Sequence, residues 1–121
     1  QAADLRTLQT TQPTTINEPI SSDEAATLTS MMIESERSTA GAGGPVSIAS
    51  KTGTAEHADS SSPGSETPYS WYIAFGPSSN AQIAVAVVVE NGDPGSASTG
   101  GAVAGPIGRA VINAQVGGAG G

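Results

Sequence analysis

An uninterrupted apolar run limits the folds open to this chain more than any other feature. Residues 83–89 read Ile-Ala-Val-Ala-Val-Val-Val, and this short, β-branched run predicts a strand within Gln82 to Glu90. Successive side chains of a strand point to opposite faces of its sheet, so a strand that is apolar at every position must be covered on both faces. The run therefore predicts a sheet with a layer packed on each side.

A second strand is expected immediately before the valine-rich run. The segment from Tyr69 to Phe75 places its large side chains on one parity. Those side chains are Tyr69, Trp71, Ile73 and Phe75. The connection, residues 76–81, is short and rich in turn-forming residues, so we expect the two strands to form an antiparallel hairpin.

A helix is predicted from about Ser22 to Arg37. Ser21 followed three residues later by Glu24 matches a capping box at its start, and the glycines and proline of residues 41–45 end it. The helical period predicts one packed face and one solvated face. The expected packed residues are Ala25, Leu28, Met31 and Met32, and the expected solvated residues are Glu34, Glu36 and Arg37.

A second helix is predicted from Ala102 to about Gln115. Pro106 falls near its first turn, where the missing N–H costs little. Gly105 and Gly108 would allow this helix to approach a sheet closely. The two helices can cover one face of the valine-rich strand, and covering the other face requires protein that is not in this chain.

We therefore expect the chain to be part of one domain. Residues 20–116 are expected to be folded, with residues 1–19 a loose N-terminal segment and residues 117–121 a flexible glycine-rich tail. The chain begins at Gln1 rather than at a methionine, which agrees with a fragment of a longer protein.

Charge and composition exclude several classes of function. The net charge is -7, and the four basic residues, Arg6, Arg37, Lys51 and Arg109, are scattered, which argues against nucleic acid and anionic lipid as partners. The absence of cysteine removes disulfides, thiolate catalysis and thiolate metal sites. No apolar run approaches the length of about 20 residues that a membrane span needs.

The stretch from Val46 to Ala55 contains the strongest candidate site. It predicts a strand in which Thr52 and Thr54 share one face with Ser50, while Lys51 and Gly53 lie on the other parity. Hydroxyl donors beside an ammonium charge suit an anion, and a glycine inside a strand lets an extended ligand come close to the backbone. The pattern is typical of a carboxylate clamp, although a strand end with small polar residues is the plain alternative.

Other candidate chemistry is weaker. His57 has acidic neighbours but no second histidine or cysteine, so we interpret it as an exposed residue of a surface loop at 56–68 that either flanks the site or is a plain linker. The segment 91–93, Asn-Gly-Asp, lacks the spacing of a calcium loop, and the glycine clusters lack the ending of a phosphate loop. We expect no metal and no cofactor.

Lys-Thr-Gly in this context has a known counterpart, because it is the third motif of penicillin-binding proteins and class A β-lactamases. From about residue 20 to residue 115 the chain resembles the C-terminal part of a class B penicillin-binding protein transpeptidase domain. The matching segments are Ile48–Glu56, Trp71–Phe75, Val87–Asn91, Gly100–Ala102 and Gly105–Ile107. The resemblance implies an α+β fold, with an antiparallel sheet flanked by helices.

The resemblance also implies a function. It points to a serine D,D-transpeptidase that cross-links peptidoglycan stem peptides and is acylated by β-lactams, at the extracytoplasmic face of a bacterial membrane and anchored through an N-terminal segment outside this chain. Lys51 would set charge and protonation beside a serine of the second motif. Thr52, Gly53 and Thr54 would bind the substrate, with the Thr54 amide as one of two oxyanion donors.

The family's first two motifs are missing from the expected place. The nucleophile lies in Ser-x-x-Lys and the second motif is Ser-x-Asn, and neither occurs upstream of Lys51. We therefore expect this chain alone to be inactive and to work with an N-terminal remainder that carries both motifs. A D,D-carboxypeptidase, a serine β-lactamase and an inactive peptide-binding module remain alternatives.

Overall fold

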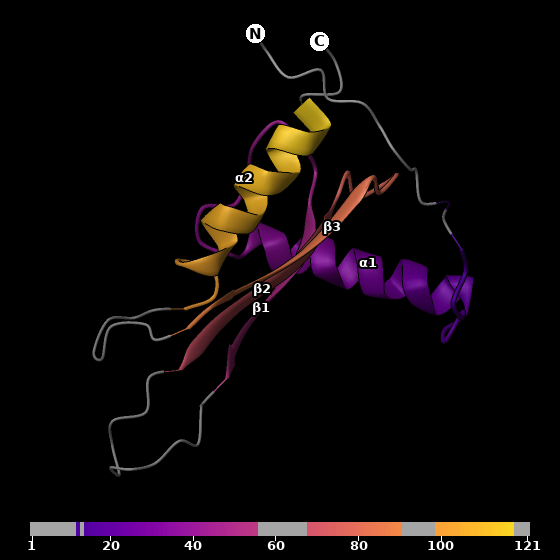
Figure 1. Cartoon of the computed structure of the whole chain (residues 1–121), viewed down its shortest axis with the longest axis horizontal. Helices are drawn as coiled ribbons and strands as arrows, with labels where there is room; N and C mark the ends of the chain where they lie inside the picture. Colours follow the sequence, from indigo (N-terminus) through magenta and orange to yellow (C-terminus); the bar gives the residue numbers. More distant parts are fainter. Residues whose placement is uncertain (1–11, 13, 56–67, 91–98, 118–121) are drawn as a thin grey trace, which may run out of the picture.

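The computed structural model describes residues 12, 14–55, 68–90 and 99–117 of the chain. These residues form three consecutive strands with one helix before them and one helix after them in the chain (Figure 1). The elements are α1 (Ser22–Arg37), β1 (Ala49–Ala55), β2 (Tyr69–Gly76), β3 (Ile83–Val89) and α2 (Ala104–Gly117). Most of the predicted N-terminal segment, most of the loop that holds His57, the turn at 91–93 and residues 118–121 lie outside the described residues.

The three strands form one antiparallel sheet in the order β1-β2-β3. Tyr72 in the middle strand pairs with Thr52 on one side and with Val87 on the other. The predicted hairpin of β2 and β3 is confirmed, and its turn is held by a hydrogen bond from the Gln82 amide to the Gly76 carbonyl at 2.9 Å. In this part of the chain, β1 and β3 are the edge strands.

The two faces of the sheet differ sharply in burial. One face carries the fully buried Tyr72 and the buried Ala74, and α2 packs against it across β2 and β3. The opposite face presents Trp71, Ile73 and Val88, and the Ile73 side chain is 46% exposed. Within the described residues, α2 covers β3 on one face and no helix covers the other, as the apolar run predicted. The prediction that both helices cover this strand is only partly right, because α1 packs mainly against β1.

The predicted bounds of α1 are confirmed, and its packing is partly different from the prediction. The capping box at Ser21 and Glu24 is present. Leu28 and Met31, however, are 51% and 64% exposed. Leu28 lies in the N-terminal half of the helix, which projects beyond the strands (Figure 1), whereas Met31 lies in the C-terminal half, where the neighbouring Met32 and Ile33 are more buried. The prediction that Glu36 faces solvent is wrong, since it is 6% exposed and lies in the interior.

Strand β1 begins at Ala49, three residues later than predicted. Its partner strand β2 ends at Gly76, and the following Pro77 has no N–H to continue the ladder. Val46 and Ile48 still contribute to the apolar core, although they precede the strand.

Helix α2 begins two residues later than predicted and extends to Gly117. Its close contact with the sheet is confirmed at Gly108, where a Cβ atom would lie 2.6 Å from Cδ1 of Tyr72. Ile112 is fully buried one turn further on. In the described part of the chain, neither helix is long and apolar enough to cross a membrane.

Candidate functional site

The predicted site residues lie in the exposed second half of β1. Ala49 and Ser50 are buried, whereas Lys51 and Thr54 are exposed. The Lys51 ammonium donates a hydrogen bond to the backbone carbonyl of the adjacent Thr52 at 2.8 Å. This contact places the positive charge next to a threonine that lies on the opposite parity.

A polar pocket of about 290 Å³ lies between β1 and the C-terminal end of α1. Lys51 and Thr52 form the wall contributed by the strand. The other walls come from the end of α1 and from the loop before α2. They consist of Ser35, Ser38, Thr39, Ala40, Thr99 and Gly101.

The helix wall of this pocket is held in place by its own hydroxyl groups. Thr39 donates through Oγ1 to the Ser35 carbonyl at 2.8 Å, and Ser38 donates through Oγ to the same carbonyl at 3.0 Å. Gly101 closes the pocket from the other side, where a Cβ atom would lie 2.8 Å from Cγ2 of Thr39. A side chain at this position would therefore collide with the helix wall.

The structure places only part of the predicted set around this pocket. Lys51 and Thr52 line it, while Gly53 and Thr54 continue along the strand outside its lining. A Cβ atom at Gly53 would lie 3.4 Å from Cβ of Trp71 on the neighbouring strand. Thr52 and Thr54 share one parity, so the two hydroxyls follow one another along a single face of the strand, as predicted.

A buried charged cluster lies directly behind β1. The Glu36 carboxylate accepts hydrogen bonds from Ser50 Oγ at 2.5 Å, from Tyr72 Oη at 2.9 Å and from Arg109 Nε at 2.5 Å. The Arg109 guanidinium also donates to the Ala40 carbonyl at 3.0 Å and lies over the Tyr72 ring. The residues come from α1, β1, β2 and α2.

The pKa values in the cluster follow from burial and from these hydrogen bonds. Burial by itself would raise the pKa of Glu36, but the hydrogen bonds from Arg109, Ser50 and Tyr72 outweigh burial and hold this pKa below its ordinary value. Burial raises the pKa of the Tyr72 phenol to about 12. The bond to Glu36 raises the pKa of Arg109. The cluster is therefore an ion pair with a neutral phenol at neutral pH.

Sequence reasoning missed this cluster because its members are distant in the chain. A local signal did exist, since Glu36 follows Met32 and Ile33 at helical spacing and so belongs to the face that packs. The sequence also contains one Ser-x-Asn, at residues 78–80, downstream of Lys51. It lies in the turn between β2 and β3, where Ser78 pairs with Ser47 before the start of β1, so it is not part of the pocket.

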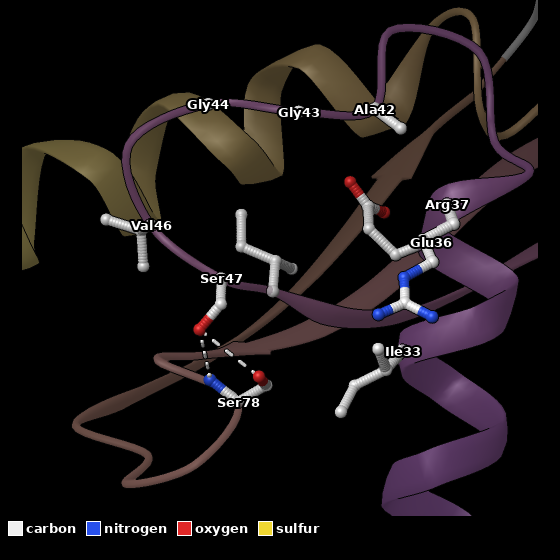
Figure 2. Close-up of a pocket in the computed structure, with 10 residues that line it drawn as sticks. Ile33, Glu36, Arg37, Ala42, Gly43, Gly44, Val46, Ser47 and Ser78 are labelled. Atoms are coloured by element: carbon white, nitrogen blue, oxygen red, sulfur yellow. Dashed lines mark hydrogen bonds between the residues drawn. The ribbon is translucent and has the colours of Figure 1, made fainter.

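A second pocket, of about 330 Å³, lies between α1 and the segment that leads into β1 (Figure 2). It is bordered by Ile33, by the glycine-rich loop at 42–44, and by Ser47 and Ser78. Figure 2 shows Ser78 contacting Ser47 at one end of this pocket, with the Oγ atoms 3.2 Å apart. Among the described residues, no group of three or more His, Cys, Asp or Glu side chains could hold a metal ion.

Comparison with known proteins gives a consistent result. The family model described as the penicillin binding protein transpeptidase domain matches residues 2–113. The peptidoglycan D,D-transpeptidase PbpA of Mycolicibacterium smegmatis is 49% identical over 115 residues, which cover 93% of this chain and 23% of the relative. The protein of the same name from Mycobacterium tuberculosis is 46% identical over the same share of each chain.

Solved structures agree with the sequence comparison. The crystal structure of PBPA from Mycobacterium tuberculosis matches with a TM-score of 0.68 and 45% identity, over 83% of this chain and 24% of that one. The ceftriaxone acyl-enzyme complex of penicillin-binding protein A from the same organism matches with a TM-score of 0.67 and 51% identity, over 76% and 21%. The predicted fold, the C-terminal part of such a domain, is confirmed, and the chain spans about a quarter of the length of these relatives.

Proposed function

The chain belongs to the penicillin-binding protein transpeptidase domain family, and on that premise we propose that it forms the Lys-Thr-Gly wall of the active site in a peptidoglycan D,D-transpeptidase. The observation that carries the proposal is the pocket at the exposed edge of β1, where Lys51 and Thr52 meet the end of α1. An edge strand offers a bound peptide both side chains and backbone groups. The site is therefore suited to holding an extended peptide end.

The chemistry of the wall suits a carboxylate. The Thr52 and Thr54 hydroxyls lie on one face, and each can donate a hydrogen bond to an anion held along the strand. The Lys51 ammonium lies at the same edge and adds positive charge. Hydrogen bonds to a charged group are about twice as strong as neutral ones. In this proposal Thr52, Gly53 and Thr54 hold the substrate carboxylate end or the β-lactam carboxylate.

The reaction is an acyl transfer in two steps. A serine oxygen attacks the substrate carbonyl, an ester bond forms, and the amide bond breaks with protonation of its leaving nitrogen. The amine of a second stem peptide then replaces the serine. The Thr54 backbone N–H serves as one of two donors to the oxyanion, and loss of one such donor typically slows turnover about 100- to 1000-fold. Lys51 sets the protonation state of a serine in the second motif.

The nucleophile is proposed to come from the remainder of the same protein, which carries Ser-x-x-Lys and Ser-x-Asn. Two observations support this partner. The chain matches only 23% of the length of its relatives, and the face with Trp71, Ile73 and Val88 is open in the described part of the chain. Open apolar faces mark surfaces that another layer covers. We place the protein at the extracytoplasmic face of the membrane, anchored by an N-terminal segment.

Two isosteric substitutions test the clamp in the full-length protein. Thr52→Val and Thr54→Val each remove a hydroxyl while keeping the shape of the side chain. Loss of a hydrogen bond to a charged group costs about 1.5–3 kcal/mol, so the second-order rate of acylation by a fluorescent penicillin should fall about 10- to 100-fold. Thr27→Val is the matched control, because Thr27 is an exposed residue of α1 outside the pocket.

Acylation of both clamp variants at the wild-type rate would contradict the carboxylate clamp. A full-length protein that no penicillin labels would contradict the enzyme and favour the inactive peptide-binding module. Product analysis separates the remaining alternatives, because a transpeptidase passes the acyl group to an amine, whereas a carboxypeptidase or β-lactamase passes it to water.

A further inference from the structure

One buried carboxylate joins the elements that surround the Lys-Thr-Gly strand. Glu36, in the last turn of α1, accepts hydrogen bonds from Ser50 in β1, from Tyr72 in β2 and from Arg109 in α2. Figure 2 shows its side chain extending from the end of the helix. Glu36 and Arg109 are each 6% exposed, so these contacts are largely shielded from water, although Glu36 also lines the second pocket.

Each of these contacts ends next to the pocket. Ser50 is the residue immediately before Lys51, and Tyr72 is the register partner of Thr52. Arg109 donates to the carbonyl of Ala40, which lines the pocket on the side of α1. The carboxylate therefore fixes the strand wall and the helix wall relative to each other.

Stability alone does not explain a charged pair in this place. Removing two charges from water costs several kcal/mol per ion, and well-packed apolar residues are commonly as stabilising as a buried ion pair. Directed hydrogen bonds, in contrast, fix atoms along defined directions. Sites that must hold a reacting group depend on such support, because a misplacement of about 1 Å can slow a reaction about 100-fold.

We infer that Glu36, with Arg109, is a positioning residue that holds the Lys-Thr-Gly strand in the geometry needed for acylation. The inference rests on the proposed function and adds to it two residues outside the family motifs. The exposed side chains of Glu34 and Arg37, on the same helix, pair with each other at 2.9 Å, and neither residue lines the polar pocket beside β1. Ser38 contacts only the backbone carbonyl of Glu34, which a side-chain substitution keeps. The Glu34–Arg37 pair provides a natural comparison within the same turn.

The test uses the full-length protein and measures acylation by a fluorescent penicillin, with rate and binding constants determined separately. Glu36→Gln is expected to lower the second-order acylation rate about 10- to 100-fold. Glu34→Gln is expected to leave it unchanged. All rates are measured well below the unfolding midpoint of each variant, so that a loss of folded protein cannot imitate a loss of rate.

A double variant separates positioning from folding. Glu36→Gln combined with Arg109→Gln leaves no unpaired buried charge, so its unfolding midpoint should rise above that of Glu36→Gln. Its acylation should stay at least about 10-fold below the wild-type rate, because the ionic hydrogen bonds are still missing. If Glu36→Gln alone fails to fold, the acylation rate of the double variant still shows whether the ion pair positions the strand.

The outcomes are distinct. Wild-type acylation rates in Glu36→Gln, or a double variant that regains the rate together with its midpoint, would overturn the positioning role while leaving the proposed function intact. A wild-type protein that takes no label would overturn the proposed function and the positioning role together. Slow acylation in a stably folded double variant, with Glu34→Gln unaffected, supports the inference.

Discussion

Replacing Gly108 with alanine tests how tightly α2 is seated on the sheet. The added Cβ would lie 2.6 Å from Cδ1 and 2.7 Å from Cε1 of Tyr72, well inside ordinary contact distance. The ring cannot move freely, because it is fully buried and its hydroxyl donates to Glu36 at 2.9 Å. Overpacking costs about 1–3 kcal/mol, and loss of a hydrogen bond to a charged group costs about 1.5–3 kcal/mol.

The helix itself gains up to about 1 kcal/mol from a Gly→Ala change. We therefore expect Gly108→Ala to destabilise the protein by about 2 kcal/mol or more, measured from the midpoint of urea unfolding of the full-length protein. Gly117→Ala is the control, since among the described residues no atom outside the helix backbone and the adjacent residues lies within 4 Å of the Cβ position there. It should be neutral or mildly stabilising. Equal midpoints for the two variants would refute the close helix–sheet contact.

Three further predictions concern stability. The pKa of Glu36 in the folded protein lies below 4.5, so its contribution is complete above that pH and is lost as the pH falls through the folded-state value. The stability difference between wild type and Glu36→Gln should accordingly shrink below pH 4.5, and a difference that grows in acid would contradict the ion pair. Ile73→Asp in the full-length protein should destabilise it by about 2 kcal/mol or more if the remainder covers the outer face of the sheet. A change within about 0.5 kcal/mol would indicate an open face. Ser21→Ala removes the cap of α1 and should cost about 1 kcal/mol, which thermal unfolding can detect against Ser22→Ala as the comparison. Equal losses in the two would argue against the capping box.

Local signals in the sequence were sufficient for much of the fold. Ser21 and Glu24 placed the start of α1 to the residue, because the capping box depends on side chains only three positions apart. The hairpin of β2 and β3 followed from alternation and a short turn. The start of β1 was less predictable, since it depends on where β2 runs out of backbone to pair with.

Long-range interactions account for what the sequence did not reveal. Glu36 and Arg109 lie 73 positions apart. Helical spacing can assign Glu36 to the packed face, but no local pattern shows which distant residue becomes its buried partner. Leu28 and Met31 fit an apolar stripe, yet both are exposed. Leu28 lies in the half of α1 that extends past the sheet and finds no layer among the described residues, and Met31 is more exposed than the neighbouring Met32 and Ile33. Periodicity predicts which face can pack and not which part of a helix meets a partner.

The candidate site also combines residues that local sequence signals indicate with residues that only the folded structure brings together. Lys51, Thr52 and Thr54 were identified from residue types and parity along a single strand. The opposite walls of the pocket, at Thr39 and Gly101, became visible only in the folded arrangement, because they come from the end of a helix and from a loop that are distant in the sequence.

The location of the β-lactam adduct decides whether this chain supplies the wall of the site or its nucleophile. The full-length protein is treated with benzylpenicillin, digested, and the acylated peptide is identified by mass spectrometry. We expect a single adduct on a serine outside residues 1–121, within a Ser-x-x-Lys segment, with slower labelling in the Thr52→Val variant. An adduct on any serine or threonine of this chain would contradict the assignment of Lys51 to Thr54 as a wall that holds the substrate for a nucleophile elsewhere.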